Sequence, residues 1–121
     1  MRILLIEDDV VTRMTLAAML ANAGYEVVEA GDGEQGLAEI ARQAPDAIFC
    51  DRMMPRVSGF EVLEAVRRDW PALNAVPFFF LSGLSDERDM MAVADLNPTD
   101  YLSKPISRGD FLSALARAKA A

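Results

Sequence analysis

The sequence has no histidine and a single cysteine, Cys50. One cysteine excludes an intramolecular disulfide, which is typical of proteins from a reducing compartment. Cys50 lies in a short apolar run, where a thiol is most often a small buried side chain. Zinc sites are usually built from histidine and cysteine, so the scarcity of both disfavours zinc and favours metals that prefer oxygen ligands.

The sequence also lacks long apolar runs and clusters of basic residues. A membrane-spanning helix needs roughly 20 apolar residues, and no run in the chain approaches that length. The apolar residues 3–6 are too few for a signal peptide and lead directly into acidic residues. A net charge of −7 without a basic stripe argues against direct nucleic-acid binding by this domain. We therefore expect a cytoplasmic protein with no membrane or nucleic-acid partner of its own.

The composition of the chain is typical of one globular domain. Apolar residues make up 52% of its 121 residues and charged residues 26%, which suits a packed core and argues against disorder. No linker, repeat or low-complexity segment interrupts the chain. We expect residues 1–121 to form a single domain.

Short apolar segments alternate with longer helical patterns along the chain. Residues 3–6, 47–50 and 78–81 are almost continuously apolar, which is typical of strands covered on both faces in a parallel sheet. The predicted strands are Arg2 to Ile6, Glu26 to Glu29, Ala47 to Cys50, Pro77 to Leu81 and Tyr101 to Ser103.

Five helices are predicted from apolar residues at helical spacing. Their apolar positions are Met14, Ala17, Ala18 and Ala21; Leu37, Ile40, Ala41 and Ala44; Phe60, Leu63 and Val66; Met90, Met91, Val93 and Ala94; and Phe111, Leu112, Leu115 and Ala116. The expected N-caps are Asp9, Asp32, Ser58 (with Glu61 in a capping box), Ser85 and Ser107, and Gly24 is expected to end the first helix. Five units of strand and helix predict an α/β domain with helices on both faces of the sheet.

Polar and charged residues stand where the predicted strands end. Glu7, Asp8 and Asp9 follow the first strand, Asp51 the third, Ser82 the fourth and Lys104 the fifth. Taken singly, each has an ordinary explanation as a cap, turn or surface residue. Ligands of open α/β sheets bind beyond the carboxyl ends of the strands, so parallel strands would bring all of them to one site.

The chemistry of that site points to a cation and a phosphoryl group. Several carboxylates in one small site repel one another unless a cation joins them, and oxygen ligands favour Mg²⁺. A carboxylate nucleophile with a metal, a lysine and a hydroxyl beside it has what phosphoryl transfer requires, because these groups neutralise charge on the phosphoryl oxygens.

With these residues in view, the whole chain resembles the receiver domains of bacterial two-component response regulators. Four segments carry the resemblance, in order and at family-like spacing. They are Ile3-Leu4-Leu5-Ile6-Glu7-Asp8-Asp9, Asp51-Arg52-Met53-Met54-Pro55-Arg56-Val57-Ser58-Gly59, Phe80-Leu81-Ser82-Gly83 and Asp100-Tyr101-Leu102-Ser103-Lys104-Pro105. The resemblance implies a doubly wound, flavodoxin-like sheet of five parallel strands in the order 2-1-3-4-5.

The resemblance also implies a role for each site residue. Asp51 would accept a phosphoryl group from a sensor histidine kinase or a histidine phosphotransfer protein. Mg²⁺, for which Mn²⁺ could substitute, would be held by Glu7, Asp8, Asp51 and the backbone carbonyl of Met53. Lys104 would pair with the phosphoryl group, aimed by a cis peptide before Pro105, and Ser82 and Tyr101 would form a conformational switch.

The switch would in turn control a partner. It would act through a face formed by the fourth helix, the fifth strand and the fifth helix. The partner would be a downstream protein or a fused output domain, and the same face would serve a homodimer. Such a domain is a regulator rather than a turnover enzyme.

Some positions depart from the usual pattern of the family. Ser82 replaces a more frequent threonine, Gly83 a usual alanine, and Asn97-Pro98-Thr99 a common Gly-Ala-acidic run. Apolar Met53 and Leu84 follow Asp51 and Ser82 by two residues, so no side chain is expected to orient a hydrolytic water, and the phosphoryl group should be lost slowly.

Three alternatives remain at this point. The first is a receiver-like interaction module that binds its partner without phosphorylation. The second is an aspartyl-phosphate hydrolase, which would usually carry an aspartate where this chain has Met53. The third is a flavin binder, but Glu7, Asp8 and Asp9 would repel a flavin phosphate in the absence of a metal.

Overall fold

We describe the chain from a computed structural model that defines residues 1–82, 94–96 and 98–120, the side chains of 94 and 118–120 excepted. Strands and helices alternate through most of these residues. The elements are β1 (Arg2–Ile6), α1 (Val10–Asn22), β2 (Glu26–Ala30), α2 (Gly33–Arg42), β3 (Ala47–Asp51), α3 (Gly59–Asp69), the 3₁₀ turn η1 (Pro71–Leu73), β4 (Phe78–Ser82), the 3₁₀ turn η2 (Ala94–Leu96), β5 (Asp100–Ser103) and α5 (Arg108–Ala120).

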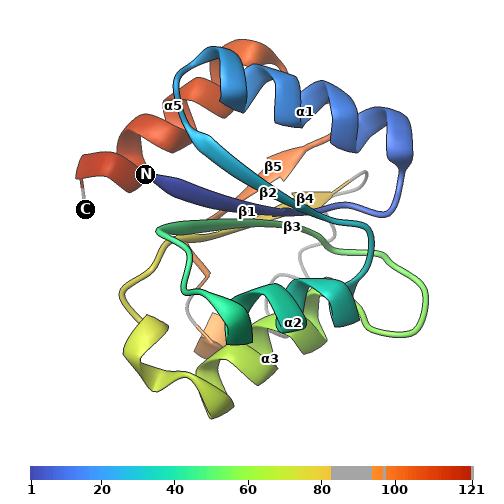
Figure 1. Ribbon diagram of the computed structural model, residues 1–121, viewed down its shortest axis with the longest axis vertical. Helices are drawn as coiled ribbons and strands as arrows, with labels where there is room; N and C mark the ends of the chain where they lie inside the picture. The colour runs from blue at the N-terminus through green and yellow to red at the C-terminus, as the bar shows by residue number, and fades with distance from the viewer. Residues whose placement is uncertain (83–93, 97, 121) are drawn as a thin grey trace.

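The five strands form one parallel sheet in the order β2-β1-β3-β4-β5. Figure 1 shows α1 and α5 on one face of this sheet and α2 and α3 on the other. The predicted doubly wound, flavodoxin-like α/β fold is confirmed. Each predicted strand is present, with bounds that differ by at most one residue at either end.

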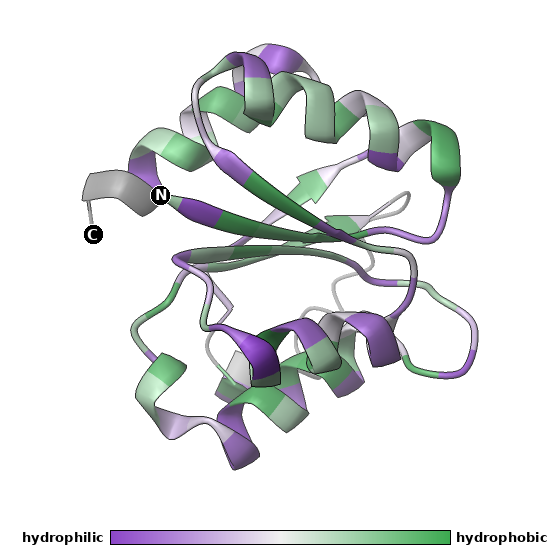
Figure 2. Ribbon diagram, in the orientation of Figure 1, coloured by the Kyte–Doolittle hydropathy of each residue, from purple (hydrophilic) through white to green (hydrophobic). Residues whose placement is uncertain are grey.

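Alternate side chains of the strands enter two separate hydrophobic cores. Leu5, Phe49 and Phe79 pack toward α1 and α5, whereas Leu4, Ile48 and Phe80 pack toward α2 and α3. Figure 2 shows the central strands as almost continuously hydrophobic ribbons. Because both faces are covered, these strands need apolar residues at every position. Cys50 is fully buried in β3, as its apolar surroundings predicted.

The predicted helix caps are confirmed wherever the chain is described. The side chains of Asp9, Asp32, Ser58 and Ser107 each accept a hydrogen bond from the backbone three residues on. Ser58 and Glu61 form the predicted capping box. Gly24 has a φ of +93°, the left-handed conformation that ends helices and that glycine adopts without strain.

The predicted buried face of α1 was wrong. Met14 is 62% exposed, and the helix instead buries Leu16 and Leu20. The helix carries apolar residues on several of its own sides, so its sequence is compatible with more than one buried face. Burying the large leucines removes the most apolar surface from water. On α2, Ala41 is exposed, and Ala44 lies beyond the end of the helix at Arg42.

The predicted fourth helix and its cap Ser85 lie outside the described residues, apart from Ala94 in η2. On α3, Leu63 and Val66 are buried as predicted. On α5, Phe111 and Leu115 are buried as predicted, but Ala116 is exposed. Among the described helices, none is both long enough and apolar enough to cross a membrane.

Candidate functional site

The carboxyl ends of three strands converge on one cluster of charged side chains. Glu7 follows β1, Asp51 ends β3 and Lys104 follows β5. The Lys104 Nζ lies 2.9 Å from each carboxylate oxygen of Glu7 and 3.2 Å from Oδ2 of Asp51. The prediction that these side chains meet at one edge of the sheet is confirmed.

The Glu7 carboxylate lies inside the protein. This residue is 0% exposed, its backbone N–H donates to the Ala30 carbonyl at 3.1 Å, and its Oε1 accepts from the Asp9 backbone N–H at 3.3 Å. The bond to Ala30 continues the ladder between β1 and β2 beyond the end of β1. The sheet itself therefore determines where this carboxylate lies.

The arrangement of oxygens is suited to a divalent cation. One oxygen from each of Glu7, Asp8 and Asp51 lies within 4.8 Å of the others. Oε2 of Glu7 is buried without a hydrogen bond, although the Lys104 ammonium lies at ion-pair distance from it. Three carboxylates against one ammonium leave excess negative charge, which a hard cation with oxygen ligands would balance. The donor set fits Mg²⁺, with Mn²⁺ as a chemical substitute.

Burial and neighbouring charges shift the protonation of the cluster. Burial raises the pKa of Asp51 from 3.8 to about 7, aided by the charge of Glu7 and a hydrogen bond with Asp8 and opposed by Lys104. Burial acts to lower the pKa of Lys104, but the hydrogen bond with Glu7 and the charge of Asp51 outweigh it, so that pKa is raised. Lys104 is thus an ammonium at neutral pH, and a bound cation would favour ionised Asp51.

The contribution of Asp51 to the stability of the metal-free protein should fall as pH rises from about 4 to about 7. The folded-state pKa of Asp51, about 7, lies above the unfolded value of 3.8, so the native state binds more protons within this window and loses stability as they leave. Asp51→Asn mimics the protonated side chain. It should gain on the order of a few kcal/mol over the original chain above pH 7 and little below pH 4.

The measurement is urea unfolding of both proteins in EDTA across this pH range. Subtracting the two curves removes the contribution of the other titrating groups. A difference in unfolding free energy that does not change with pH would contradict the raised pKa of Asp51.

The loop of residues 52–58 lies directly beside Asp51. A Cβ at Gly59 would lie 3.0 Å from the Cα of Arg52, so the close approach of α3 to this loop requires glycine. The Met53 backbone N–H makes a long hydrogen bond of 3.4 Å to Oδ1 of Asp51, and its side chain is 67% exposed. The backbone of Met53 therefore lies next to Asp51. That its carbonyl holds a metal stays a prediction.

The two residues predicted to form a switch lie on adjacent strands. Ser82 ends β4 and is buried, and its carbonyl accepts from the Lys104 backbone N–H at 2.7 Å. Tyr101 on β5 stacks on Phe80, with ring centroids 5.4 Å apart. The peptide between Lys104 and Pro105 is cis, as predicted.

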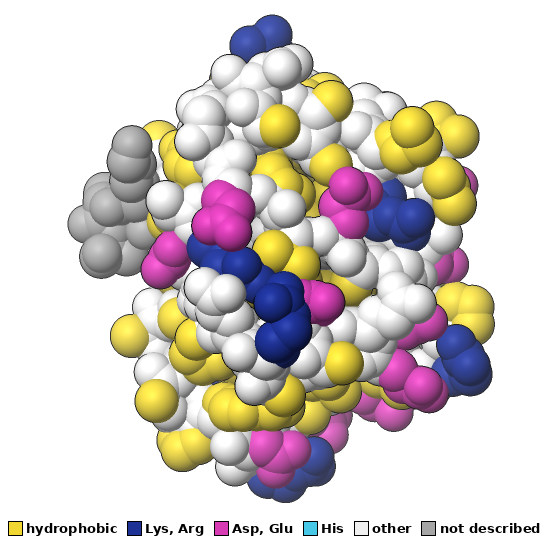
Figure 3. Space-filling model, in the orientation of Figure 1, with side chains coloured by type: hydrophobic (Ala, Val, Ile, Leu, Met, Phe, Trp, Pro, Cys, Tyr) yellow, Lys and Arg dark blue, Asp and Glu magenta, His cyan; other side chains and the backbone are white. Residues whose placement is uncertain are grey.

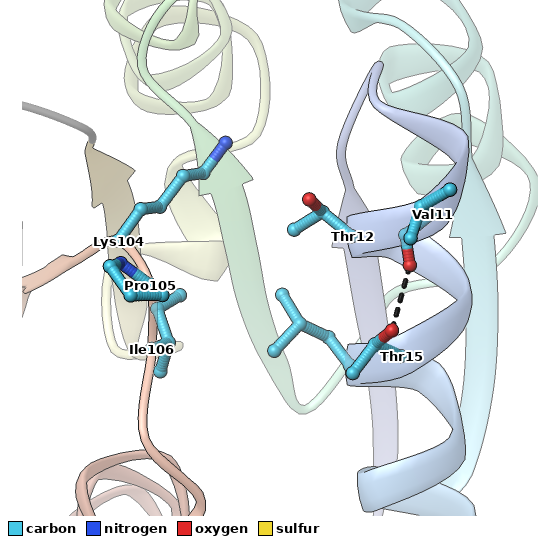
Figure 4. Close-up of a pocket in the computed structure, with 7 residues that line it drawn as sticks. Val11, Thr12, Thr15, Lys104, Pro105 and Ile106 are labelled. Atoms are coloured by element: carbon cyan, nitrogen blue, oxygen red, sulfur yellow. Dashed lines mark hydrogen bonds between the residues drawn. The ribbon is translucent and has the colours of Figure 1, made fainter.

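A largely apolar groove of about 390 Å³ opens beside Lys104 (Figure 4). It lies between the first turns of α1 and the segment after β5, and is lined by Val11, Thr12, Thr15, Leu16, Lys104, Pro105 and Ile106. Val11 is 72% exposed and Val10 54%. Sequence reasoning did not identify these α1 residues as functional, because α1 is apolar on several sides and only tertiary packing shows which side remains open.

Charges of both signs are interspersed on the surface. On the face drawn in Figure 3, lysine and arginine side chains alternate with acidic and hydrophobic ones among the described residues. Ion pairs such as Arg2 with Glu26 and Arg13 with Glu29 join charges of opposite sign. Among the described residues drawn there, the basic side chains do not form an extended surface of the kind that binds phosphate backbones.

The fold and the site together define a class of protein: a doubly wound α/β domain with carboxylates and a lysine at the carboxyl ends of its parallel strands. Within that class, the chain matches the model of the response regulator receiver domain over residues 3–116 and belongs to this family. Members of the family are regulatory domains of phosphorylation-dependent two-component signalling rather than classical enzymes. Response regulators interact with histidine kinases and with output domains.

Curated relatives are similar over nearly the whole chain. The chain is 37% identical over 119 residues to the DNA-binding dual master transcriptional regulator RpaA of Synechocystis, which covers 98% of this chain and 48% of that protein. It is 36% identical over 116 residues to the transcriptional regulatory protein AfsQ1 of Streptomyces coelicolor, covering 96% and 49%. The chain thus spans about half the length of these relatives.

Solved structures of other proteins have the same fold as this chain. Chemotaxis protein CheY4 of Vibrio cholerae superimposes with a TM-score of 0.91 at 29% identity, covering 97% of each chain. A signal receiver domain of a signal transduction histidine kinase from Syntrophus aciditrophicus gives a TM-score of 0.88 at 25% identity, covering 98% of this chain and 89% of that one.

Proposed function

We propose that this chain is a phosphorylation switch whose acceptor is the Asp51 carboxylate. The observation that carries the proposal is the position of the Lys104 ammonium, 3.2 Å from Asp51 and 2.9 Å from Glu7. A carboxylate nucleophile beside a fixed ammonium is suited to phosphoryl transfer, because the ammonium neutralises charge on the phosphoryl oxygens.

The proposed physiological donor is a phosphohistidine of a sensor histidine kinase or a histidine phosphotransfer protein. A carboxylate oxygen of Asp51 forms a bond to phosphorus while the P–N bond of the phosphohistidine breaks. The leaving imidazole nitrogen keeps the electron pair and takes a proton from solvent. The product is an acyl phosphate, with Lys104 and the Ser82 hydroxyl paired to its oxygens.

The carboxylates of Glu7, Asp8 and Asp51 and the backbone carbonyl of Met53 are proposed to hold Mg²⁺, or Mn²⁺ in its place. When bound, the ion would neutralise charge on the phosphoryl oxygens. Glu7 is buried and fixed by the sheet, whereas Asp8 is exposed and open to solvent. The site therefore combines one buried ligand held in place by the sheet with one ligand that is accessible to an ion from solvent.

The donor, a sensor histidine kinase or a histidine phosphotransfer protein, is proposed to dock on the groove beside Lys104. Exposed Val11 lines this groove, and exposed Val10 precedes it at the start of α1. Exposed apolar side chains that meet at a groove are suited to the apolar face of a partner helix. A donor seated there would lie next to Lys104, and Lys104 contacts Asp51.

Phosphorylation is proposed to act through Ser82 and Tyr101. Ser82 would move toward the phosphoryl group, and the Tyr101 ring, which stacks on Phe80 two residues before Ser82, would respond. This is a shift between two populations that the phosphoryl group biases.

The output is proposed to pass through the face of the fourth helix, β5 and α5 to a downstream protein or fused output domain, or to a second copy in a homodimer. On the described part of this face, Asp100 of β5 and Arg117 of α5 form an ion pair at 2.5 Å. Slow loss of the phosphoryl group stays a prediction, because Leu84 lies outside the described residues.

Incubation with a small acyl-phosphate donor and Mg²⁺, followed by intact-mass measurement, tests the proposal. We expect the mass of one phosphoryl group to be added in Mg²⁺ and none in EDTA. The alternative, an interaction module that works without phosphorylation, predicts an unchanged mass in both arms. That result would reject the proposed switch.

A further inference from the structure

We infer that Arg13 is a positioning residue for the metal site, because it holds the turn that carries Glu7 and Asp8. The inference rests on the proposed function of that site and adds a residue to it. Arg13 lies in the first turns of α1 and is not one of the proposed ligands.

The Arg13 guanidinium joins three elements of the fold. Its Nη1 donates to the backbone carbonyl of Glu7 at 3.0 Å, and its Nε lies 3.4 Å from Oε1 of Glu29 on β2. The Arg13 side chain is only 21% exposed. One side chain thus connects α1 and β2 to the residue at which the main chain leaves β1 for the site.

The surroundings leave space for the guanidinium but little more. A Cβ at Gly31 would lie 3.0 Å from Nη1 of Arg13 and 3.4 Å from Oε1 of Gln35. Gln35 in turn accepts from the Gly31 backbone N–H at 2.8 Å. A planar guanidinium can contact the Glu7 carbonyl and Glu29 through different nitrogens, whereas a lysine ammonium, a single point of charge, would have to serve both from one atom.

The hydrogen-bond and ion-pair partners of Arg13 determine how it would act on the metal site. Lys104 contacts the Glu7 and Asp51 carboxylates directly, so it competes with a cation for the same oxygens. Arg13 contacts the backbone carbonyl of Glu7 instead, which leaves the carboxylate oxygens to Lys104 and the ion. Residues that orient metal ligands in this way typically change metal affinity 10–100-fold when they are replaced.

The test compares Mg²⁺ affinity by isothermal titration calorimetry for the original chain and Arg13→Gln. We expect roughly tenfold weaker binding in the variant. Arg13→Lys should bind with intermediate affinity. Glu29→Gln, which keeps Arg13 but weakens its outer contact, should show a smaller loss in the same direction.

The matched control is Arg42→Gln. Arg42 forms an exposed ion pair with Glu39 at 2.7 Å on α2, so this variant removes the same charge at an exposed position that contacts none of the proposed ligands. Its Mg²⁺ affinity should equal that of the original chain. Equal losses of Mg²⁺ affinity in the Arg13→Gln and Arg42→Gln variants would show that net charge causes the effect, and would overturn the inference.

Two further readouts separate positioning from a merely structural role. With the small acyl-phosphate donor, Arg13→Gln should need about tenfold more Mg²⁺ for half-maximal labelling, but should reach the original rate at saturating Mg²⁺. Urea unfolding in EDTA reports the stability of each variant without the metal. Unchanged Mg²⁺ affinity in Arg13→Gln would overturn the role of Arg13 but leave the proposed metal site standing. Failure of the original chain to bind Mg²⁺ would overturn both.

Discussion

Asp51→Asn is expected to abolish phosphoryl labelling, lowering the rate by at least about a thousandfold. The amide lacks the anionic oxygen that forms the bond to phosphorus. Glu7, the other carboxylate that Lys104 contacts, is 0% exposed. Asparagine has nearly the same shape as aspartic acid, so the fold should persist. The measurement is the time course of intact mass with the small acyl-phosphate donor in Mg²⁺.

Asp69→Asn is the matched control for this prediction. It makes the same chemical change at an exposed aspartate near the end of α3 that pairs only with neighbouring Arg68 among the described residues. Its labelling should follow that of the original chain. If Asp51→Asn were labelled at the original rate, another residue would be the acceptor, and peptide mapping of the labelled protein would identify it.

Phe49→Ala is expected to lower the free energy of unfolding by about 3–5 kcal/mol, a large share of the roughly 5–15 kcal/mol that stabilises a typical domain. Phe49 is 0% exposed at the centre of the sheet. Its ring stacks on Phe79 and meets the edge of Phe111, with centroids 4.7 Å apart in both cases. Alanine would leave a cavity where β3, β4 and α5 pack together. Urea unfolding with a cooperative fit measures the loss.

Phe60→Ala provides the control for this core substitution. Phe60 also makes an edge contact with a core ring, Phe80, at 5.1 Å, but it is only partly buried on α3. Its replacement should cost roughly 1–2 kcal/mol, because water can reach the vacated space. Equal losses in the two variants would contradict the central role assigned to the stacked rings.

Much of the site could be predicted from sequence because it depends on strand ends. In a parallel sheet all strands run in the same direction, so residues that end β1, β3 and β5 must meet at one edge. Glu7, Asp51 and Lys104 were predicted together on that basis. The caps could also be predicted, because an aspartate or serine bonds to the backbone three residues on, a strictly local interaction.

Residues whose importance depends on distant partners could not be predicted in this way. No sequence pattern marks Arg13 as functional, because it lies in a helix whose pattern is mainly apolar. Its two partners lie outside this helix: the Glu7 carbonyl follows β1, and Glu29 belongs to β2. The buried face of α1 was likewise predicted wrongly. Met14 and Leu16 are both apolar, and the choice between them depends on what β1, β3 and α5 leave open.

The fold class, the strand ends and the cluster of acidic residues could be predicted from the order of residues along the chain. These properties follow from local periodicity and from the common direction of parallel strands. The buried side of α1, the contact of Arg13 with the Glu7 carbonyl and the groove beside Lys104 became evident only from the packed fold. Such features depend on how side chains from separate elements share space, and a linear pattern holds no information on distances between elements until the chain has packed.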